Sequence, residues 1–239
     1  MNIQDLLNLA DHECLEAIVD YYHEAAKQDD AVTNYLNRKG LNHAELVDQF
    51  KLGVAKRQLG LLLPEKQLKS GKLIRSKLQD LGILRTSGHE HLNGSLVVPI
   101  LDIEGKLIDL FGQKLNLSLR KGTPLELNLN PDVTGIWNLS AINSHDELIV
   151  CANIIDAMTF WRHGYLNVVG LYLRSQLTIA EINLFKEHGV KRLLIAPELS
   201  TSSDDIQQQD IDCYCLKLPL GISVNQYANS VPNSAEALG

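Results

Sequence analysis

Residues 147–198 read ELIVCANIIDAMTFWRHGYLNVVGLYLRSQLTIAEINLFKEHGVKRLLIAPE, and this stretch decides the fold. Three short apolar runs, at 147–152, 167–173 and 191–198, alternate with two segments of helical length, at 154–163 and 178–188. Strands that alternate with helices are typical of a parallel sheet with crossover helices. A polar segment and one more apolar run, CYCLKL at 213–218, follow. The pattern predicts an α/β domain over residues 146–239.

The residues before this domain follow two other patterns. Apolar side chains recur near the helical period and predict helices over 4–27, 30–39, 43–50 and 65–81. Two apolar runs within 95–115 meet at Asp102–Gly105, which is typical of a hairpin. We therefore expect an α/β chain, α+β overall, with a mostly helical region over 1–88, a small mixed β region over 89–145, and the α/β domain.

Composition limits the classes of function. The chain has 239 residues, of which 45% are hydrophobic, enough for a full core, and no apolar run approaches the ~20 residues of a membrane span. The amphipathic, acidic N-terminus does not resemble a signal peptide, so we expect a cytoplasmic protein with no membrane partner. Four cysteines occur without a C-x-x-C pair, which excludes a tetrathiolate zinc ribbon.

The charge balance argues against general nucleic-acid binding, but the basic residues are clustered. The chain carries 22 Lys and Arg against 29 Asp and Glu, a formal charge of −7. Because phosphates reward cationic surfaces, an acidic chain needs a local basic cluster to bind DNA. The candidates lie in two groups: Lys66, Lys69, Lys72, Arg75, Lys77 and Arg85, and then Arg120 and Lys121. The first group is equally compatible with a solvated helix face.

The expected strand ends carry little metal chemistry. In an open α/β sheet, ligands bind at the carboxyl ends of the strands. Magnesium needs clustered oxygen ligands, and Glu198 with Asp204 or Asp205 is a weak candidate set because an irregular loop separates them. Asp156 falls in a first helical turn, where a carboxylate commonly serves the helix dipole. The run His89, Glu90, His91 lacks further ligands nearby, and we interpret it as a loop that leads into a strand.

Segments along most of the chain resemble a known family. AVTNYLNRKGLNHAELVDQFKLGVA, at 31–55, places Tyr35, Leu36, Arg38, Gly40 and Leu41 ahead of Phe50, Leu52 and Gly53. LVVPILDIEGKLIDLFGQKL, at 96–115, and a closing segment with Gly221, Asn225, Tyr227 and Ala228 continue the match. Together these segments resemble the DnaG-type bacterial primases, in the Toprim-containing branch of plasmids and phages. The resemblance implies a primase core with a Toprim domain and a role connected with DNA replication.

The same resemblance implies a degenerate active site. The family's catalytic glutamate after the first Toprim strand corresponds to Ala152, and its Asp-x-Asp pair corresponds to Glu198 and Ser200. Its Gly-Arg pair after the hairpin corresponds to Gly112 and Gln113, although Lys114 remains as a nucleic-acid-binding candidate. The family's zinc-binding module is expected before residue 1. Alanine cannot bind a metal or transfer a proton, so the resemblance predicts a pseudoenzyme with no cofactor.

Three functions remain open from the sequence. We expect a catalytically inactive primase-like protein that binds DNA, with single-stranded DNA as the first candidate, or that serves as a protein partner in replication, transposition or defence of a mobile element. The first alternative is an active primase or Toprim nuclease that holds Mg²⁺ with rearranged ligands, namely Glu198, Asp204, Asp205 and Asp156. The second is a pure interaction subunit or inhibitor that never contacts nucleic acid.

Overall fold

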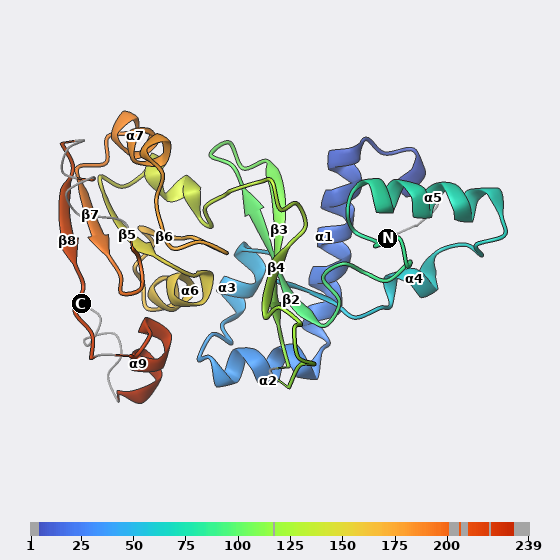
Figure 1. Cartoon of the computed structure of the whole chain (residues 1–239), viewed down its shortest axis with the longest axis horizontal. Coiled ribbons are helices and arrows are strands. Elements are labelled where there is room, and N and C mark those ends of the chain that lie inside the picture. The colour runs from blue at the N-terminus through green and yellow to red at the C-terminus, as the bar shows by residue number, and fades with distance from the viewer. Residues whose placement is uncertain (1–4, 117, 201–205, 207–209, 220, 232–239) are drawn as a thin grey trace. The chain divides into compact units, whose positions relative to one another are not determined.

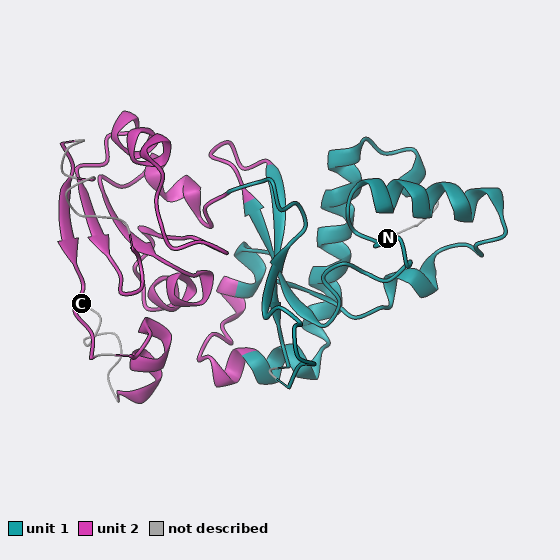
Figure 2. Cartoon of the chain, in the orientation of Figure 1, with its two compact units in different colours: residues 1–35, 47–100, 107–134 teal, residues 36–46, 101–106, 135–239 magenta. Residues whose placement is uncertain are grey.

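The computed structural model of the chain describes residues 5–116, 118–200, 206, 210–219 and 221–231 (Figure 1). The chain forms two compact units (Figure 2). The N-terminal unit contains residues 1–35, 47–100 and 107–134, and the C-terminal unit contains 36–46, 101–106 and 135–239. Within the described ranges, no helix is both long enough and apolar enough to cross a membrane.

Helices and a small sheet form the N-terminal unit and its borders. The helices are η1 (Asp5–Leu7), α1 (Asp11–Lys27), α2 (Asp30–Arg38), α3 (Ala44–Gln49), α4 (Leu59–Leu62) and α5 (Lys69–Asp80). The strands are β1 (Gly53–Ala55), β2 (Ser95–Leu101), β3 (Leu107–Lys114) and β4 (Glu126–Asn128), in the order β1-β2-β3-β4. The predicted helices are confirmed as α1, α2, α3 and α5. β1 was not predicted, because three residues are too few to show a period.

α1 packs its apolar face against the N-terminal sheet. Ile18 and Tyr22 lie one helical turn apart and are both buried, in one cluster with Val97 of β2 and Leu110 of β3. Gly53 is required at this contact because a Cβ atom there would lie 2.7 Å from Cβ of Tyr22. Burial of each such aliphatic side chain contributes about 2 kcal/mol. The helix and the sheet therefore form one core.

The predicted hairpin between β2 and β3 is confirmed. The N–H of Asp102 donates to the carbonyl of Lys106 at 2.9 Å, which closes the turn. Oδ1 of Asp102 accepts the N–H groups of Glu104 and Lys106 at 3.1 and 2.8 Å. An aspartate at the start of a turn stabilises it in this way. Sequence-local chemistry is thus enough to specify this connection.

The C-terminal unit is built on a parallel sheet. Its strands β5 (Glu147–Cys151), β6 (Val168–Gly170), β7 (Arg192–Ile195) and β8 (Asp212–Cys215) lie in the order β6-β5-β7-β8, and all three pairings are parallel. α6 (Ile154–Arg162) connects β5 to β6, and α7 (Ile179–Glu187) connects β6 to β7. The predicted mixed α/β class and alternating order are confirmed.

Two helices of this unit, α6 and α9, differ in how well the sequence predicts them. Every residue of α6 from Ile154 to Trp161 is buried, because the helix packs on β5, β6 and α9 (Val224–Ser230). α6 was predicted from its apolar content, whereas α9 was not predicted. The VNQYANS sequence of α9 is polar and short, and the helix is stabilised by a capping box between Ser223 and Gln226 and by its contact with α6.

Candidate nucleic-acid interface

A basic pocket lies in the N-terminal unit. It has a volume of about 380 Å³ and is lined by three cationic side chains, Arg57, Arg85 and Lys114, and by His89, Glu90 and His91. The remaining lining comes from Ser87, Asn93, Gly122, Thr123, Pro124 and Leu127. Residues more than sixty positions apart in the sequence thus meet here. Of the basic residues predicted from the sequence, Arg85 and Lys114 line this pocket directly.

Glu90 organises the floor of the pocket. Its carboxylate is buried, and Oε1 accepts the N–H of Leu59 at 3.2 Å, while Oε2 has no hydrogen-bond partner among the described residues. Burial raises the pKa of Glu90, and the hydrogen bond from Leu59 opposes that rise. Arg57 has a left-handed backbone with φ of 64°, which costs a non-glycine residue about 1 kcal/mol. Glu90 therefore fixes Leu59 at the start of α4, two residues after the strained Arg57 that lines the pocket.

Burial and neighbouring positive charge lower the pKa of two side chains of the pocket, Lys114 and His91. Burial lowers the pKa of Lys114, and the charge of Arg85 lowers it further. Burial also lowers the pKa of His91, followed by the charges of Arg85 and Lys114. Nζ of Lys114 donates to the carbonyl of Asn93 at 2.5 Å, which fixes the buried ammonium in place. Positive groups held together in this way gain stability when an anion such as a phosphate binds.

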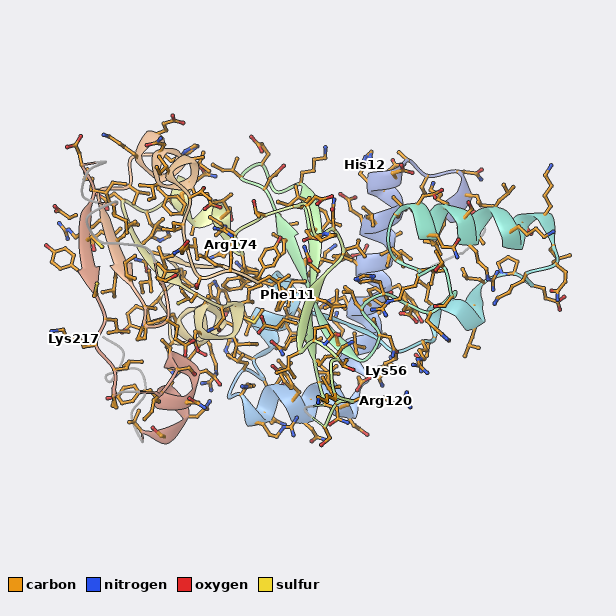
Figure 3. The ribbon with its side chains drawn as sticks, in the orientation of Figure 1. His12, Lys56, Phe111, Arg120, Arg174 and Lys217 are labelled. Carbon is orange, nitrogen blue, oxygen red and sulfur yellow. The ribbon has the colours of Figure 1, made fainter. Side chains whose placement is uncertain are left out.

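Two further basic groups lie beside the pocket. The N–H of Thr123 donates to the carbonyl of Arg120 at 3.0 Å, so Arg120 and Lys121 belong to the turn whose next three residues line the pocket. Both side chains are exposed, and Arg120 is labelled in Figure 3. Nζ of Lys66 lies 3.6 Å from the position that a Cβ atom of Gly88 would take, beside the turn at Ser87 and His89. These residues form the rim of the pocket.

Other residues of the predicted basic cluster have different roles. Arg75 donates to the carbonyls of Pro64, Gly71 and Gly60 at 2.5, 3.2 and 3.4 Å. Lys77 donates to the carbonyl of Leu9 and lies 3.9 Å from Asp11. Lys69 and Lys72 are exposed on α5. Arg75 and Lys77 thus stabilise the unit, and the rim does not include them.

Gln113 stands where the resemblance expects an arginine. Its side chain is buried, and Nε2 donates to the carbonyl of Leu125 at 3.3 Å. The bond ties β3 to the segment that leads into β4. The amide therefore has a structural role and supplies no charge to the neighbouring pocket.

The strand ends of the C-terminal unit carry few acidic groups. Ala152 follows β5, and Glu198 follows β7 with a left-handed φ of 74° and an exposed side chain. Oγ of Ser200 lies 3.0 Å from Oγ of Ser175 and donates to the Ser175 carbonyl at 3.1 Å. The other two predicted candidates, Asp204 and Asp205, lie outside the described residues.

Asp156 belongs to a buried hydrogen-bond network. Its Oδ1 accepts the N–H of Asn225 at 2.8 Å, and its Oδ2 accepts Nδ2 of Asn153 at 2.9 Å. Nδ2 of Asn225 in turn donates to Oγ1 of Thr159 at 2.9 Å and to the carbonyl of Lys39 at 2.7 Å. The Asp156 carboxylate thus joins α6 to α9, and Asn225 extends the network to residues 36–46. Asp156 is an internal anchor of the fold.

This donor set does not fit a divalent metal. Among the described residues of the two strand ends, only Glu198 supplies a carboxylate, while Ser200 is bonded to Ser175 and Asp156 to Asn153 and Asn225. Nowhere in the described ranges do three His, Cys, Asp or Glu side chains form a group that could hold a metal ion. Magnesium requires several oxygen ligands close together. We derive no metal-dependent step from these residues.

The sequence alone did not identify Arg57 or the role of His91. Arg57 was missed because it follows a strand too short to predict, and His91 was interpreted only as part of a loop. The adjacent pair Lys56 and Arg57, directly after an apolar run, was the available signal. This pair could be assigned to a site only in the folded chain, where Arg57 meets Lys114 of the hairpin strand β3.

Several solved structures are similar to this chain. The zinc-binding and RNA polymerase domains of the Aquifex aeolicus primase give a TM-score of 0.71 at 19% identity over 99% of this chain, which spans 59% of that structure. A DNA primase domain from Pseudomonas aeruginosa gives 0.70 at 19% identity, with 92% of this chain and 75% of that one covered. A DnaG primase catalytic domain bound to single-stranded DNA gives 0.71 at 18% identity, with 99% and 77% covered.

These likenesses define the fold. No protein-family model and no curated protein sequence matches the chain. At such low identities, similarity of structure establishes the arrangement of the elements and leaves the activity open. The expectation of a DnaG-type, Toprim-like fold is confirmed.

Proposed function

We propose that this chain, whose fold is that of the DnaG-type primase catalytic cores, binds single-stranded DNA without synthesising primers. The observation that carries the proposal is the pocket that brings together Arg57, Arg85 and Lys114, in which burial and then the charge of Arg85 lower the pKa of Lys114. A phosphate relieves that repulsion and releases counterions from the DNA. One similar structure is a DnaG primase catalytic domain bound to single-stranded DNA, which supports the choice of ligand.

The strand ends support the absence of synthesis. Polymerisation by metal-bound phosphoryl transfer needs carboxylates that hold two cations against the substrate phosphates. Ala152 and Ser200 supply none, and Asp156 is committed to Asn153 and Asn225. We propose accordingly that the protein contributes to replication, transposition or defence of a mobile element by binding DNA or a partner. Its place in the cell would be the cytoplasm.

Salt dependence of DNA binding tests the first half of the proposal. Arg85→Gln and Lys114→Gln should each weaken binding of a fluorescent single-stranded oligonucleotide about tenfold at low salt. Each should also reduce the slope of log affinity against log salt by about 0.7, the value for one phosphate contact on a single strand. Lys217→Gln, an exposed lysine of the C-terminal unit, is the matched control and should change neither quantity. Equal slopes in all four proteins would refute the proposed site.

A templated ribonucleotide assay tests the second half. With Mg²⁺ or Mn²⁺ and a single-stranded template, the wild type should give no product above a blank without protein. Product that Glu198→Ala abolishes would instead establish an active enzyme with rearranged ligands. DNA binding measured on the same preparation shows that the protein is folded.

A further inference from the structure

The N-terminal unit exposes more leucine than its core requires. Leu61 is 83% exposed, and Leu62, Leu68 and Leu73 are 53%, 53% and 51% exposed. All four lie on α4, on α5 or on the segment between them. α5 buries Gly71, Ile74 and Leu78, which are spaced three and four residues apart and already complete its inward face. The four leucines are thus exposed apolar side chains on two helices and their connection, where a protein surface normally places polar side chains.

The backbone under these leucines is rigid. The guanidinium of Arg75 donates to the carbonyls of Pro64, Gly71 and Gly60, so a single side chain joins α5 to α4 and to their connection. A Cβ atom at Gly71 would lie 2.0 Å from the carbonyl oxygen of Glu65, which shows how closely the connection packs on α5. A preformed surface loses little conformational entropy when a partner binds.

The charge around the leucines is strongly positive in a chain of net negative charge. Residues 56–77 contain seven Lys and Arg and a single acidic residue, Glu65. Lys56 contacts Asp29, and Arg75 and Lys77 bond within the unit. Lys69 and Lys72 are exposed, and within the described ranges neither has an ion-pair partner. We call Leu61, Leu62, Leu68, Leu73, Lys69 and Lys72 the leucine–lysine surface.

Single-stranded DNA is a poor match for this surface. Proteins that hold single strands combine cations with aromatic rings on which the bases stack. Residues 56–77 include no Phe, Trp or Tyr. Leucine cannot stack on a base in the same way, although it packs well against aliphatic side chains of a protein. Exposed leucine beside lysine therefore indicates a protein partner more than a nucleic acid.

We propose that the leucine–lysine surface docks an acidic amphipathic helix of a partner protein. The apolar face of that helix would contact Leu61, Leu62 and Leu68, and its flanking carboxylates would pair with Lys69 and Lys72. Leu73 also lines a pocket of about 610 Å³, but Asp11 and Asp80 line the same pocket and would repel an acidic helix, so the helix is placed over Leu61, Leu62 and Leu68. Docking of an amphipathic helix through spaced apolar anchors is a recurring mode of recognition.

A pair of peptides tests the apolar half of the proposal. The probe is a fluorescein-labelled helical peptide with leucine at helical spacing and glutamate on both flanks, and the control is its scrambled isomer. The wild type should bind the probe at least about tenfold more tightly than the isomer. Leu61→Ser with Leu68→Ser should remove the difference. Leu166→Ser, at a leucine of the C-terminal unit that is 51% exposed, should not. Equal affinity of the wild type for both peptides would overturn the proposal.

A charge swap tests the electrostatic half. Lys69→Glu with Lys72→Glu should weaken the glutamate peptide about tenfold and strengthen a lysine version of the same peptide by a similar factor. Lys217→Glu should do neither. The swapped protein should keep the single-stranded DNA affinity that Arg85 and Lys114 provide, which separates this surface from the pocket. Loss of DNA affinity in the swap, or binding to anionic lipid vesicles in place of the peptide, would reject a protein helix as the occupant.

Discussion

The basic pocket of the N-terminal unit and the strand ends of the C-terminal unit differ in how their polar groups are paired. In the pocket, burial and then the charge of Arg85 lower the pKa of both Lys114 and His91. Near the strand ends, Asp156 is saturated by hydrogen bonds from Asn153 and Asn225, and Ser200 bonds to Ser175. Both regions contain a residue with a left-handed backbone, Arg57 and Glu198, so charge and not strain distinguishes them. Unbalanced charge is typical of a region that binds a ligand, whereas saturated hydrogen bonds are typical of a region that stabilises the fold.

The largest expected effect concerns the saturated region. Asp156→Ala leaves the buried N–H of Asn225 and the half-buried amide of Asn153 without an acceptor, so the free energy of unfolding should fall by about 3 kcal/mol. Urea unfolding followed by circular dichroism measures the change. Asp132→Ala, at an exposed aspartate, should stay within about 0.5 kcal/mol of the wild type. If the two variants were equally stable, Asp156 would not be an anchor.

The next largest effect is a response of stability to Mg²⁺, which tests whether Ala152 and Ser200 account for the proposed loss of metal binding. The thermal midpoint of the wild type should not respond to Mg²⁺. The double variant Ala152→Glu, Ser200→Asp should be less stable without Mg²⁺, because added carboxylates repel. It should gain about 1.4 kcal/mol when Mg²⁺ is tenfold above its Kd. Differential scanning calorimetry with Ca²⁺ as a second cation makes the comparison. A metal response in the wild type itself would contradict the proposed inactive site.

A smaller effect tests the strain at the pocket. Arg57→Gly removes the cost of a left-handed backbone, so the protein should become more stable by about 0.5–1 kcal/mol while its affinity for single-stranded DNA falls. Lys51→Gly is a suitable comparison because Lys51 also has a positive φ, of 45°, and lies outside the pocket. That variant should leave DNA affinity unchanged. Arg57→Gly with undiminished DNA affinity would remove Arg57 from the proposed interface.

The smallest effect is a pH dependence. Burial, and then Arg85, lowers the pKa of His91 below its ordinary 6.5, so the folded protein favours neutral His91. That contribution to stability is complete above the ordinary pKa and is lost as the pH falls through the lowered one. A bound phosphate opposes the lowering, so DNA affinity should rise roughly threefold between about pH 7.5 and pH 6 at constant ionic strength.

Substitution of His91 tests whether this side chain carries the pH dependence. His91→Gln should flatten the curve of DNA affinity between about pH 7.5 and pH 6. Fluorescence anisotropy of a labelled oligonucleotide gives both curves. An affinity that weakens with acidification would contradict the location of the phosphate beside His91.

Local sequence determined the order of the elements. The alternation of apolar runs with helical segments over 147–198 predicted β5, α6, β6, α7 and β7, because period and run length are properties of neighbouring residues. The turn at Asp102 was equally local. β1 was not predicted because three residues are too few to show a period, and α9 was not predicted because its polar sequence shows no apolar period, although Ser223 and Gln226 form a capping box.

For the candidate site, too, some properties follow from the sequence and others only from the tertiary structure. The sequence by itself determined that Ala152 and Ser200 supply no carboxylate for a metal, because the functional group of a side chain is fixed by the residue type. It also identified Lys66, Arg85, Lys114, Arg120 and Lys121 as candidate cations. Only the tertiary structure decided which cations meet in a pocket with Arg57 and which, like Arg75 and Lys77, bond inside the fold. The formal charge of a residue follows from its type alone. Electrostatic repulsion and burial depend on distances between residues, which are set only when the chain folds.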